Sequence, residues 1–254
     1  MNNMFFDCNK LKKINLAGWD TSNVENMHGV FSGCFVLSSI DVSHFNTSSV
    51  TKLNNMFQRC YSLTSIDVSN FDMRKVTDIS ALFSYCSSLK SLDLSNFRTD
   101  NIVIFSGLFE HCTSLTSIDI FNINLSNANS IRNLFYNCSS LTYIYTRQLN
   151  TGTVEDMSNL FGLCSSLISL DLSILDTTNV QKMNSMFSGC TNLEYIDISK
   201  FKTNNVQNMD FMFKNCKKLT SLDLSHFQTE KLRSASDMFN GCENLRYLDV
   251  SSFD

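Results

Sequence analysis

A single pattern of apolar and polar positions recurs along the whole chain with a period of 26 residues. Counted from the cysteine of each copy as position 0, leucine stands at +3, isoleucine or leucine at +6, and an aliphatic residue at +8 in all copies but one. Phenylalanine stands three residues before every cysteine. The cysteines keep the spacing without insertion or deletion: Cys8, Cys34, Cys60, Cys86, Cys112, Cys138, Cys164, Cys190, Cys216 and Cys242. Self-similarity at a period of about 20 to 50 residues is typical of a solenoid or a propeller, so the chain is predicted to be a repeat array.

Each copy predicts a short strand followed by a short helix. Side chains alternate along a strand, so the apolar +6 and +8 positions face the core while +5 and +7 face solvent. Apolar residues at +16, +19, +22 and +23, for example Val180, Met183, Met186 and Phe187, are spaced for one face of a helix. The threonine that is frequent at +13 is placed to cap its first turn. Stacked copies would pair their strands in a parallel sheet about 45 Å across.

This pattern resembles the leucine-rich repeat and, within that group, the BspA-like surface-protein repeat MFxxCxxLxxLDLSxFDTSxVxxM. The likeness covers essentially the whole chain, as in MFSGC followed by LEYIDISKFKTNNVQNM. It implies an α/β repeat solenoid of the leucine-rich-repeat type, with a parallel sheet on the concave face, short helices on the convex face and about ten coils of 26 residues. It also implies a place on the surface of bacterial or protist cells, roles in adhesion, and no enzymatic activity. It implies no particular ligand.

The unbroken register predicts one domain over residues 1–254. The chain begins and ends within a repeat, and neither end shows the distinct capping repeat that solenoids need to cover their apolar end faces. We therefore expect a fragment of a longer chain or a unit that stacks end to end. A net charge of −4 with scattered basic residues disfavours a nucleic-acid or anionic-membrane partner. No apolar run is long enough to insert into a membrane in this segment.

The regular cysteines predict a column of small buried thiols, because each lies between an inward phenylalanine and an inward leucine. Disulfides between adjacent coils are the first alternative, although identical side chains pointing the same way rarely offer the required geometry. Metal binding is the second, and it lacks support because no CxxC or CxxH spacing occurs. The sequence therefore predicts no metal ion and no cofactor.

Aspartate recurs at the outward +7 position and forms a predicted acidic ladder on the concave face. Serines at +5 and +9 can donate hydrogen bonds to these carboxylates. A solvated, hydrogen-bonded ladder and weak binding of divalent cations are the two interpretations. The ladder consists of Asp41, Asp67, Asp93, Asp119, Asp171, Asp197, Asp223 and Asp249.

One stretch departs from the repeat. Around Cys112 and Cys138 the outward positions carry Phe121, Tyr143, Tyr145 and Arg147 in place of serine and aspartate, and Tyr195 follows further along the chain. Exposed aromatic residues with an arginine have the composition of a binding hot spot, and tyrosine rings also stack on sugars. These five residues form the candidate ligand site; drift of the repeat away from its consensus is the alternative.

Catalysis is not expected. Of the four histidines only His44 and His226 share a repeat position, about 35 Å apart, so no nucleophile, base and orienting acid can be assembled. The sequence favours a cell-surface or extracellular adhesion module that contacts a protein or glycan ligand through its concave face. The alternative is a structural stalk or filament built by self-association of the solenoid ends.

Overall fold

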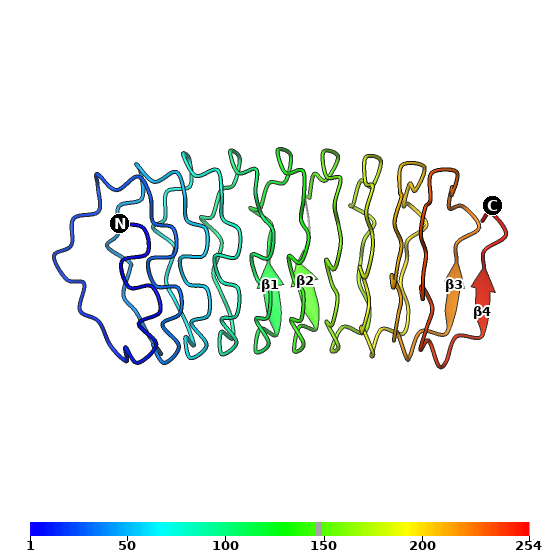
Figure 1. Ribbon diagram of the computed structural model, residues 1–254, viewed down its shortest axis with the longest axis horizontal. Coiled ribbons are helices and arrows are strands. Elements are labelled where there is room, and N and C mark those ends of the chain that lie inside the picture. The colour runs from blue at the N-terminus through cyan, green and yellow to red at the C-terminus, as the bar shows by residue number, and fades with distance from the viewer. Residues whose placement is uncertain (146–148, 254) are drawn as a thin grey trace.

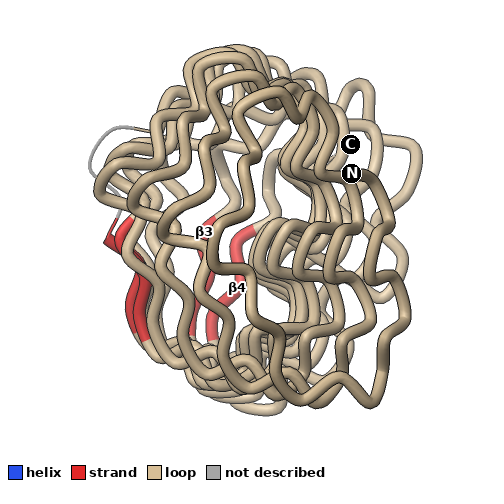
Figure 2. Tube along the Cα trace, turned by 90° about the vertical axis from the view of Figure 1, so that its left-hand side faces the viewer, coloured by secondary structure: helices blue, strands red, loops and turns tan. Residues whose placement is uncertain are grey.

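The computed structural model describes residues 1–145 and 149–253, which form a stack of coils with the two termini at opposite ends (Figure 1). Viewed along the stack, successive coils superimpose around a shared interior (Figure 2). Parallel bridges join equivalent residues 26 positions apart from one coil to the next, through Asn26, Lys52, Asp78, Ile104, Ser130, Asp156, Lys182, Asn208 and Ser234. The predicted repeat array is therefore a solenoid.

The strands occupy the predicted +5 to +7 positions but are few. Strand β1 (Ser117–Asp119) pairs in parallel with β2 (Tyr143–Tyr145), and β3 (Ser221–Asp223) pairs in parallel with β4 (Tyr247–Asp249). A single bridge joins Asp171 to Asp197 on the same side. The predicted alternation is confirmed. The middle residue of β1, β2 and β3 is buried between more exposed neighbours, and in β4 no residue is less exposed than the middle one. We call the surface formed by positions +5, +7 and +9 the strand face. In the described residues it is not the continuous sheet that the sequence predicted.

The predicted helices are wrong: the described residues contain none, and the segment from +16 to the next cysteine is a run of turns. In the coil that ends at Cys60, the amide of Met56 donates to the carbonyl of Leu53 and the amide of Cys60 to that of Phe57. The third residues of these two turns, Asn55 and Arg59, have φ of 58° and 59°. A left-handed third residue with an i to i+3 bond is the requirement of a type II turn, and a helix cannot contain it.

These turns direct every other amide along the stack. In the same coil, the amides of Leu53, Asn55, Phe57 and Arg59 donate to carbonyls 25 residues further on, in the next coil. Backbone amides buried without a partner are costly, and here the turns and the neighbouring coil satisfy them alternately. The main backbone pairing between coils therefore lies on the turn side and not on the strand face.

The threonine at +13 was expected to cap a helix, and this interpretation is also wrong. Thr177 Oγ1 donates to the carbonyl of Lys202 at 3.0 Å and accepts from the amide of the same residue at 2.7 Å. The hydroxyl thus satisfies both backbone groups of a residue in the next coil. The same donor bond to the next coil is made by Thr21, Thr47, Thr99, Thr151 and Thr203.

Two columns run through the core. The phenylalanines before each cysteine, from Phe5 to Phe239, stack ring on ring with centroids 5.5 to 6.1 Å apart and ring planes within 14° of parallel. The cysteines form the second column and are free thiols. Their predicted burial is confirmed for Cys34 through Cys216, and Cys8 and Cys242 are half-buried.

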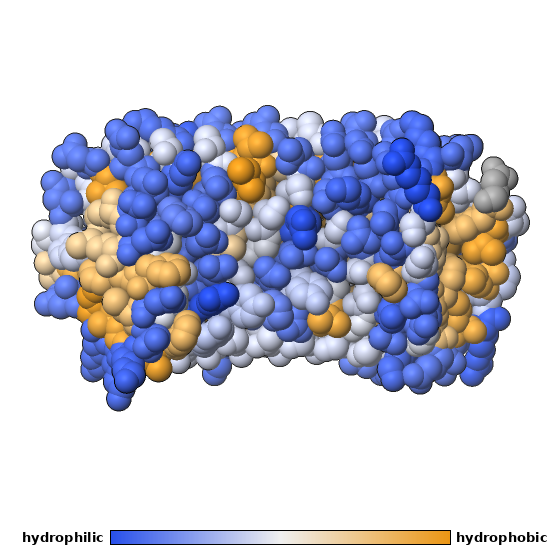
Figure 3. All heavy atoms as spheres, in the orientation of Figure 1, coloured by the Kyte–Doolittle hydropathy of each residue, from blue (hydrophilic) through white to orange (hydrophobic). Residues whose placement is uncertain are grey.

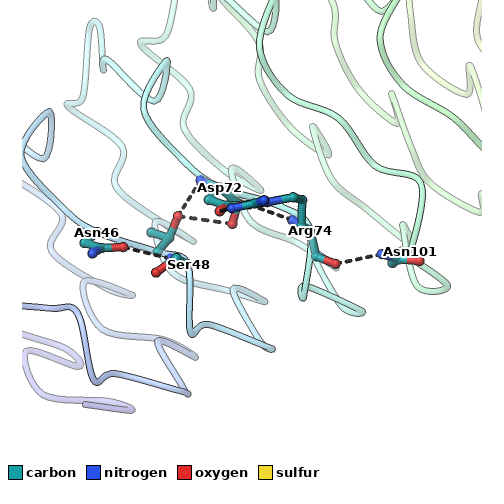
Figure 4. Close-up of polar contacts among 6 residues, drawn as sticks. Asn46, Ser48, Asp72, Arg74 and Asn101 are labelled. Atoms are coloured by element: carbon teal, nitrogen blue, oxygen red, sulfur yellow. Dashed lines mark hydrogen bonds and ion pairs between the residues drawn. The ribbon is translucent and has the colours of Figure 1, made fainter.

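The exposed corner after the strand segment is held by short polar contacts within each coil and between neighbouring coils. In Figure 4, Asn46 accepts from the amide of Ser48, and Asp72 forms an ion pair with Arg74 at 2.6 Å. Asn101 Nδ2 donates to the Arg74 carbonyl, in the preceding coil, at 2.7 Å. Asparagine amides at the same position make the equivalent bond in other coils: Asn127, Asn179 and Asn205.

Candidate functional site

The aspartates of the acidic ladder are built into turns. Each accepts, through Oδ1, the backbone amide of the residue two positions later, at 2.8 to 3.0 Å. This is the side-chain contact that lets aspartate close a turn on its own backbone. Bonds from the serine at +9 lower the carboxyl pKa of Asp41, Asp67, Asp93, Asp171, Asp197, Asp223 and Asp249.

The ladder thus has a structural role in every coil that carries it. Within residues 1–145 and 149–253, no group of three or more histidine, cysteine, aspartate or glutamate side chains is placed to hold a metal ion. The hydrogen-bonded interpretation has direct geometric support in the turn contacts, whereas the cation-binding interpretation has none.

The thiols are committed to the core. From Cys34 to Cys242, each Sγ donates to the carbonyl of the phenylalanine 29 residues earlier, at 3.0 to 3.4 Å. Burial raises the pKa of the fully buried thiols, to about 12 for Cys112 and Cys164. Thiolate is the reactive form of cysteine, so the raised pKa disfavours that form in the folded protein.

Three of the aromatic candidates lie on two adjacent coils of the strand face. Tyr143 and Tyr145 point outward from β2, are 55% and 45% exposed, and contact each other with ring centroids 4.4 Å apart in an edge-to-face arrangement. Phe121 is exposed directly after β1, where its amide bonds to Asp119. The register pairs Asp119 with Tyr145, so the three rings occupy adjacent coils. Arg147 lies outside the described residues.

Tyr195 belongs to a different place on the same face. It lines a surface hollow of about 280 Å³ with Tyr247, Asp197, Asp223 and His226, and neither Tyr143 nor Tyr145 is among the lining residues. The sequence analysis grouped Tyr195 with the patch around Tyr143, and Tyr247 lies outside the five candidate residues. Tyr195 and Tyr247 share the same repeat position two coils apart, and this is the sequence signal that places them on one surface.

A row of aromatic rings elsewhere was missed by the sequence analysis. Phe35, Tyr61, Tyr85, His111 and Tyr136 contact one another in sequence, with centroids 4.1 to 6.3 Å apart. They lie within two residues of the cysteines of consecutive coils, which is the sequence signal that could have found them. Burial lowers the pKa of His111, and its Nδ1 lies 2.8 Å from Asn137 Nδ2.

No helix in the part of the chain that the structure describes is long and apolar enough to cross a membrane. Stacked coils, a buried phenylalanine column and an outward face with exposed aromatic residues define the class as a solenoid repeat protein. The chain belongs to the family described as "Mycoplasma protein of unknown function, DUF285", whose model matches residues 1–115, 62–167 and 130–253.

No curated protein matches the chain. Among solved structures, it is similar to a leucine-rich repeat protein of T. pallidum, at 20% identity and a TM-score of 0.40, over 67% of this chain and 68% of that one. A leucine-rich repeat protein from Bacteroides ovatus is 21% identical with a TM-score of 0.35, over 98% of this chain and 80% of that one. A leucine rich cell surface protein from Faecalibacterium prausnitzii is 15% identical with a TM-score of 0.34, over 77% and 75%. At such low identities and TM-scores these likenesses carry no argument about what this chain does.

Proposed function

We propose that this chain is a BspA-like leucine-rich repeat module that binds a protein or glycan ligand at a cell surface through its strand face. The observation that supports the proposal is the cluster of Phe121, Tyr143 and Tyr145, three exposed aromatic rings on adjacent coils. Aromatic side chains are enriched at the energetic centres of interfaces because they bury a large area with few rotatable bonds.

The surrounding coils show that the repeat does not need these rings. Serine at +5 and aspartate at +7 are the usual residues, and Asp119 in the preceding coil makes the ordinary turn contact. Tyr143 and Tyr145 therefore add exposed apolar surface but do not contribute to the folding of their own coil. An outward ring that the fold does not require is best explained by a partner that covers it.

The test compares the wild type with the double variant Tyr143→Ser/Tyr145→Asp, which restores the common residues at +5 and +7. Binding is measured on a printed glycan array and on immobilised extracellular-matrix proteins. Loss of about 2 kcal/mol, or roughly thirtyfold in Kd, is expected for truncation of a hot spot. Val36→Ser, which removes another exposed apolar side chain four coils away, is the control and should bind as the wild type does. Equal binding by the double variant would contradict the proposal.

A second function, end-to-end assembly into a stalk or filament, is proposed on a separate observation. In Figure 3 apolar atoms gather toward both ends of the stack, while the surface between them is mostly hydrophilic. The residues of the first coil that are only partly buried include Phe5, Cys8 and Leu11, and those of the last include Phe239 and Leu245. Light scattering and negative-stain images over a hundredfold concentration range test this function. Rods that lengthen with concentration are expected, and a monodisperse single-chain mass would exclude them.

A further inference from the structure

The hollow between Tyr195 and Tyr247 brings together two exposed tyrosines, a small residue between them and two carboxylates. Two exposed tyrosines form its sides, at 61% and 56% exposure, and Ser221 lies between them at the same repeat position. Asp197 and Asp223 contribute carboxylates to its lining. The hollow lies at the coils of β3 and β4, toward the C-terminal end of the stack (Figure 1).

The spacing of the coils sets the width of the hollow. Tyr195 and Tyr247 are two coils apart, and the buried rings of the same three coils, Phe187, Phe213 and Phe239, are separated by 5.5 and 6.0 Å. A cation is attracted to an aromatic face within about 6 Å of the ring centroid. Because both tyrosines line the same hollow, a positive group held in it lies beside both side chains. The small Ser221 side chain leaves the space between them open.

The charge of the hollow is negative. Hydrogen bonds from Ser199 and Ser225 lower the pKa of Asp197 and Asp223, so both carboxylates are ionised at neutral pH. Each uses Oδ1 for the backbone amide of that serine, and a carboxylate has about four acceptor positions, so capacity remains for a ligand. Among the described residues, no lysine or arginine lines the hollow.

The basic groups around the hollow are Lys218, His226 and Lys200. Lys218, in the middle coil, pairs with Glu194 at 3.7 Å. His226 lies in the hollow, but its Nε2 is 3.1 Å from the carbonyl of Ile198 and its ring packs edge-on against Phe227. Lys200 is not among the lining residues, but its charge contributes to the lowered pKa of Asp197, so it partly balances that carboxylate from outside the hollow.

We propose that this hollow binds the guanidinium or ammonium group of an arginine or lysine side chain presented by a protein partner. The two tyrosine rings attract the cation and cover its alkyl stem, while Asp197 and Asp223 accept its N–H groups. An anionic group would meet two carboxylates. A neutral sugar would stack on the rings but leave the paired negative charge without a partner. The proposal deepens the proposed function, because it rests on a protein partner for the strand face and names the side chain that this part of the face selects.

The experiment uses the whole chain labelled with 3-fluorotyrosine, with the resonances assigned by single Tyr→Phe variants. The probe is the peptide acetyl-Gly-Arg-Gly-amide, and acetyl-Gly-Gln-Gly-amide and maltotriose are the comparisons. We expect saturable shifts at Tyr195 and Tyr247 with the arginine peptide and none at Tyr143 or Tyr145. Equal shifts with the glutamine peptide, larger shifts with maltotriose, or no saturable shift with the arginine peptide would each overturn the proposal.

Four variants separate the contributions. Tyr195→Ser and Asp223→Asn should each weaken binding of the arginine peptide at least fivefold, whereas Tyr195→Phe keeps the ring and should bind within twofold of the wild type. Serine occurs at +5 in other coils, so Tyr195→Ser is expected to fold. Asp67→Asn changes the same ladder position outside the hollow and is the control for a general loss of negative charge.

Failure of this proposal is distinguishable from failure of the proposed function. If the arginine peptide does not bind but the double variant at Tyr143 and Tyr145 still loses array binding, only the assignment of this hollow is wrong. If the peptide binds as expected and the double variant binds the array normally, the hollow stands and the patch around Tyr143 is not the contact site.

Discussion

The stacked phenylalanine column makes the strongest prediction about stability, and Phe109 is its best test. Phe109 is 1% exposed and stacks between Phe83, at 6.1 Å, and Phe135, at 5.6 Å. Replacing a buried phenylalanine with alanine costs about 3 to 5 kcal/mol, because the transfer free energy of the ring is lost and a cavity remains. Each stacked pair adds about 0.5 to 1.5 kcal/mol beyond the buried area. The backbone bonds between coils limit collapse of the cavity, so Phe109→Ala should cost about 4 to 5 kcal/mol.

The assay is urea unfolding followed by far-ultraviolet circular dichroism. Phe121→Ala is the matched control, because the same side chain is 45% exposed there and its removal should change the free energy of unfolding by less than about 0.5 kcal/mol. A double-mutant cycle then separates packing from general hydrophobicity. Phe83→Ala with Phe109→Ala should cost about 0.5 to 1.5 kcal/mol less than the sum of the two, because the two rings share one contact.

The pair Phe31→Ala and Phe187→Ala, whose rings lie six coils apart, should be additive within about 0.5 kcal/mol. A cost below about 1.5 kcal/mol for Phe109→Ala would refute the reasoning, since the ring would then not be a main element of the core. Equal coupling in the near and the distant pair would refute the account of the column as a series of contacts between nearest neighbours.

Three further predictions concern the repeated polar and thiol contacts. Ellman's reagent should react with Cys138 much more slowly in the native protein than in the unfolded one, because burial raises the pKa of that thiol. Labelling is measured by mass spectrometry of the Cys138 peptide, and rapid labelling of the native protein would contradict this. Bonds from Ser95 lower the pKa of Asp93, so its stabilising contribution is present above the unfolded value of about 3.9 and is lost as pH falls through the lower folded value. Asp93→Asn keeps an acceptor for the turn but does not titrate, so its free energy of unfolding should fall less steeply below about pH 4 than that of the wild type, and parallel curves would exclude the effect. Thr177→Val leaves the amide and carbonyl of Lys202 without their partner and should cost about 1 to 3 kcal/mol in urea unfolding, whereas a cost near zero would show that the bridge between coils is replaceable.

The sequence predicted what lies inside the coil better than it predicted the path of the backbone. The inward positions, exemplified by Leu53, Met56 and Phe57, are fully buried as expected. The helix that the same spacing predicted is absent because consecutive four-residue turns also bring positions three and four apart to one side. Periodicity alone does not distinguish the two conformations. Asn55 and Arg59 adopt left-handed conformations that interrupt any helix, and only Gly29 and the glycines at equivalent positions hinted at them in the sequence.

The candidate site was predictable in part. The exposure of Tyr143, Tyr145 and Tyr195 follows from the alternation of strand side chains, and all three point outward. The hollow around Tyr195 could not be derived from any one repeat, because its lining comes from three coils and depends on a small residue at Ser221 between two large ones. Thr177 was placed on the correct corner, but its partner lies in the next coil, 25 residues away, and local capping rules consider only the nearest residues.

The regular positions of this solenoid are accounted for by its own structure. The ladder aspartates close turns, the corner threonines join coils, and the thiols bond to the phenylalanine carbonyls, so these three repeated positions have their partners within the stack. A residue that every coil uses for folding cannot distinguish one ligand from another, since it presents the same group along the whole length. Selectivity must therefore come from departures from the repeat. On the strand face the aromatic departures among the described residues are Phe121, Tyr143, Tyr145, Tyr195 and Tyr247, exposed rings in two separate groups. A partner that engages both groups must span several coils. The two groups differ in their surroundings, because Tyr195 and Tyr247 share a hollow with two carboxylates whereas Phe121 lines one with both Arg98 and Asp100, so such a partner would favour one orientation along the stack.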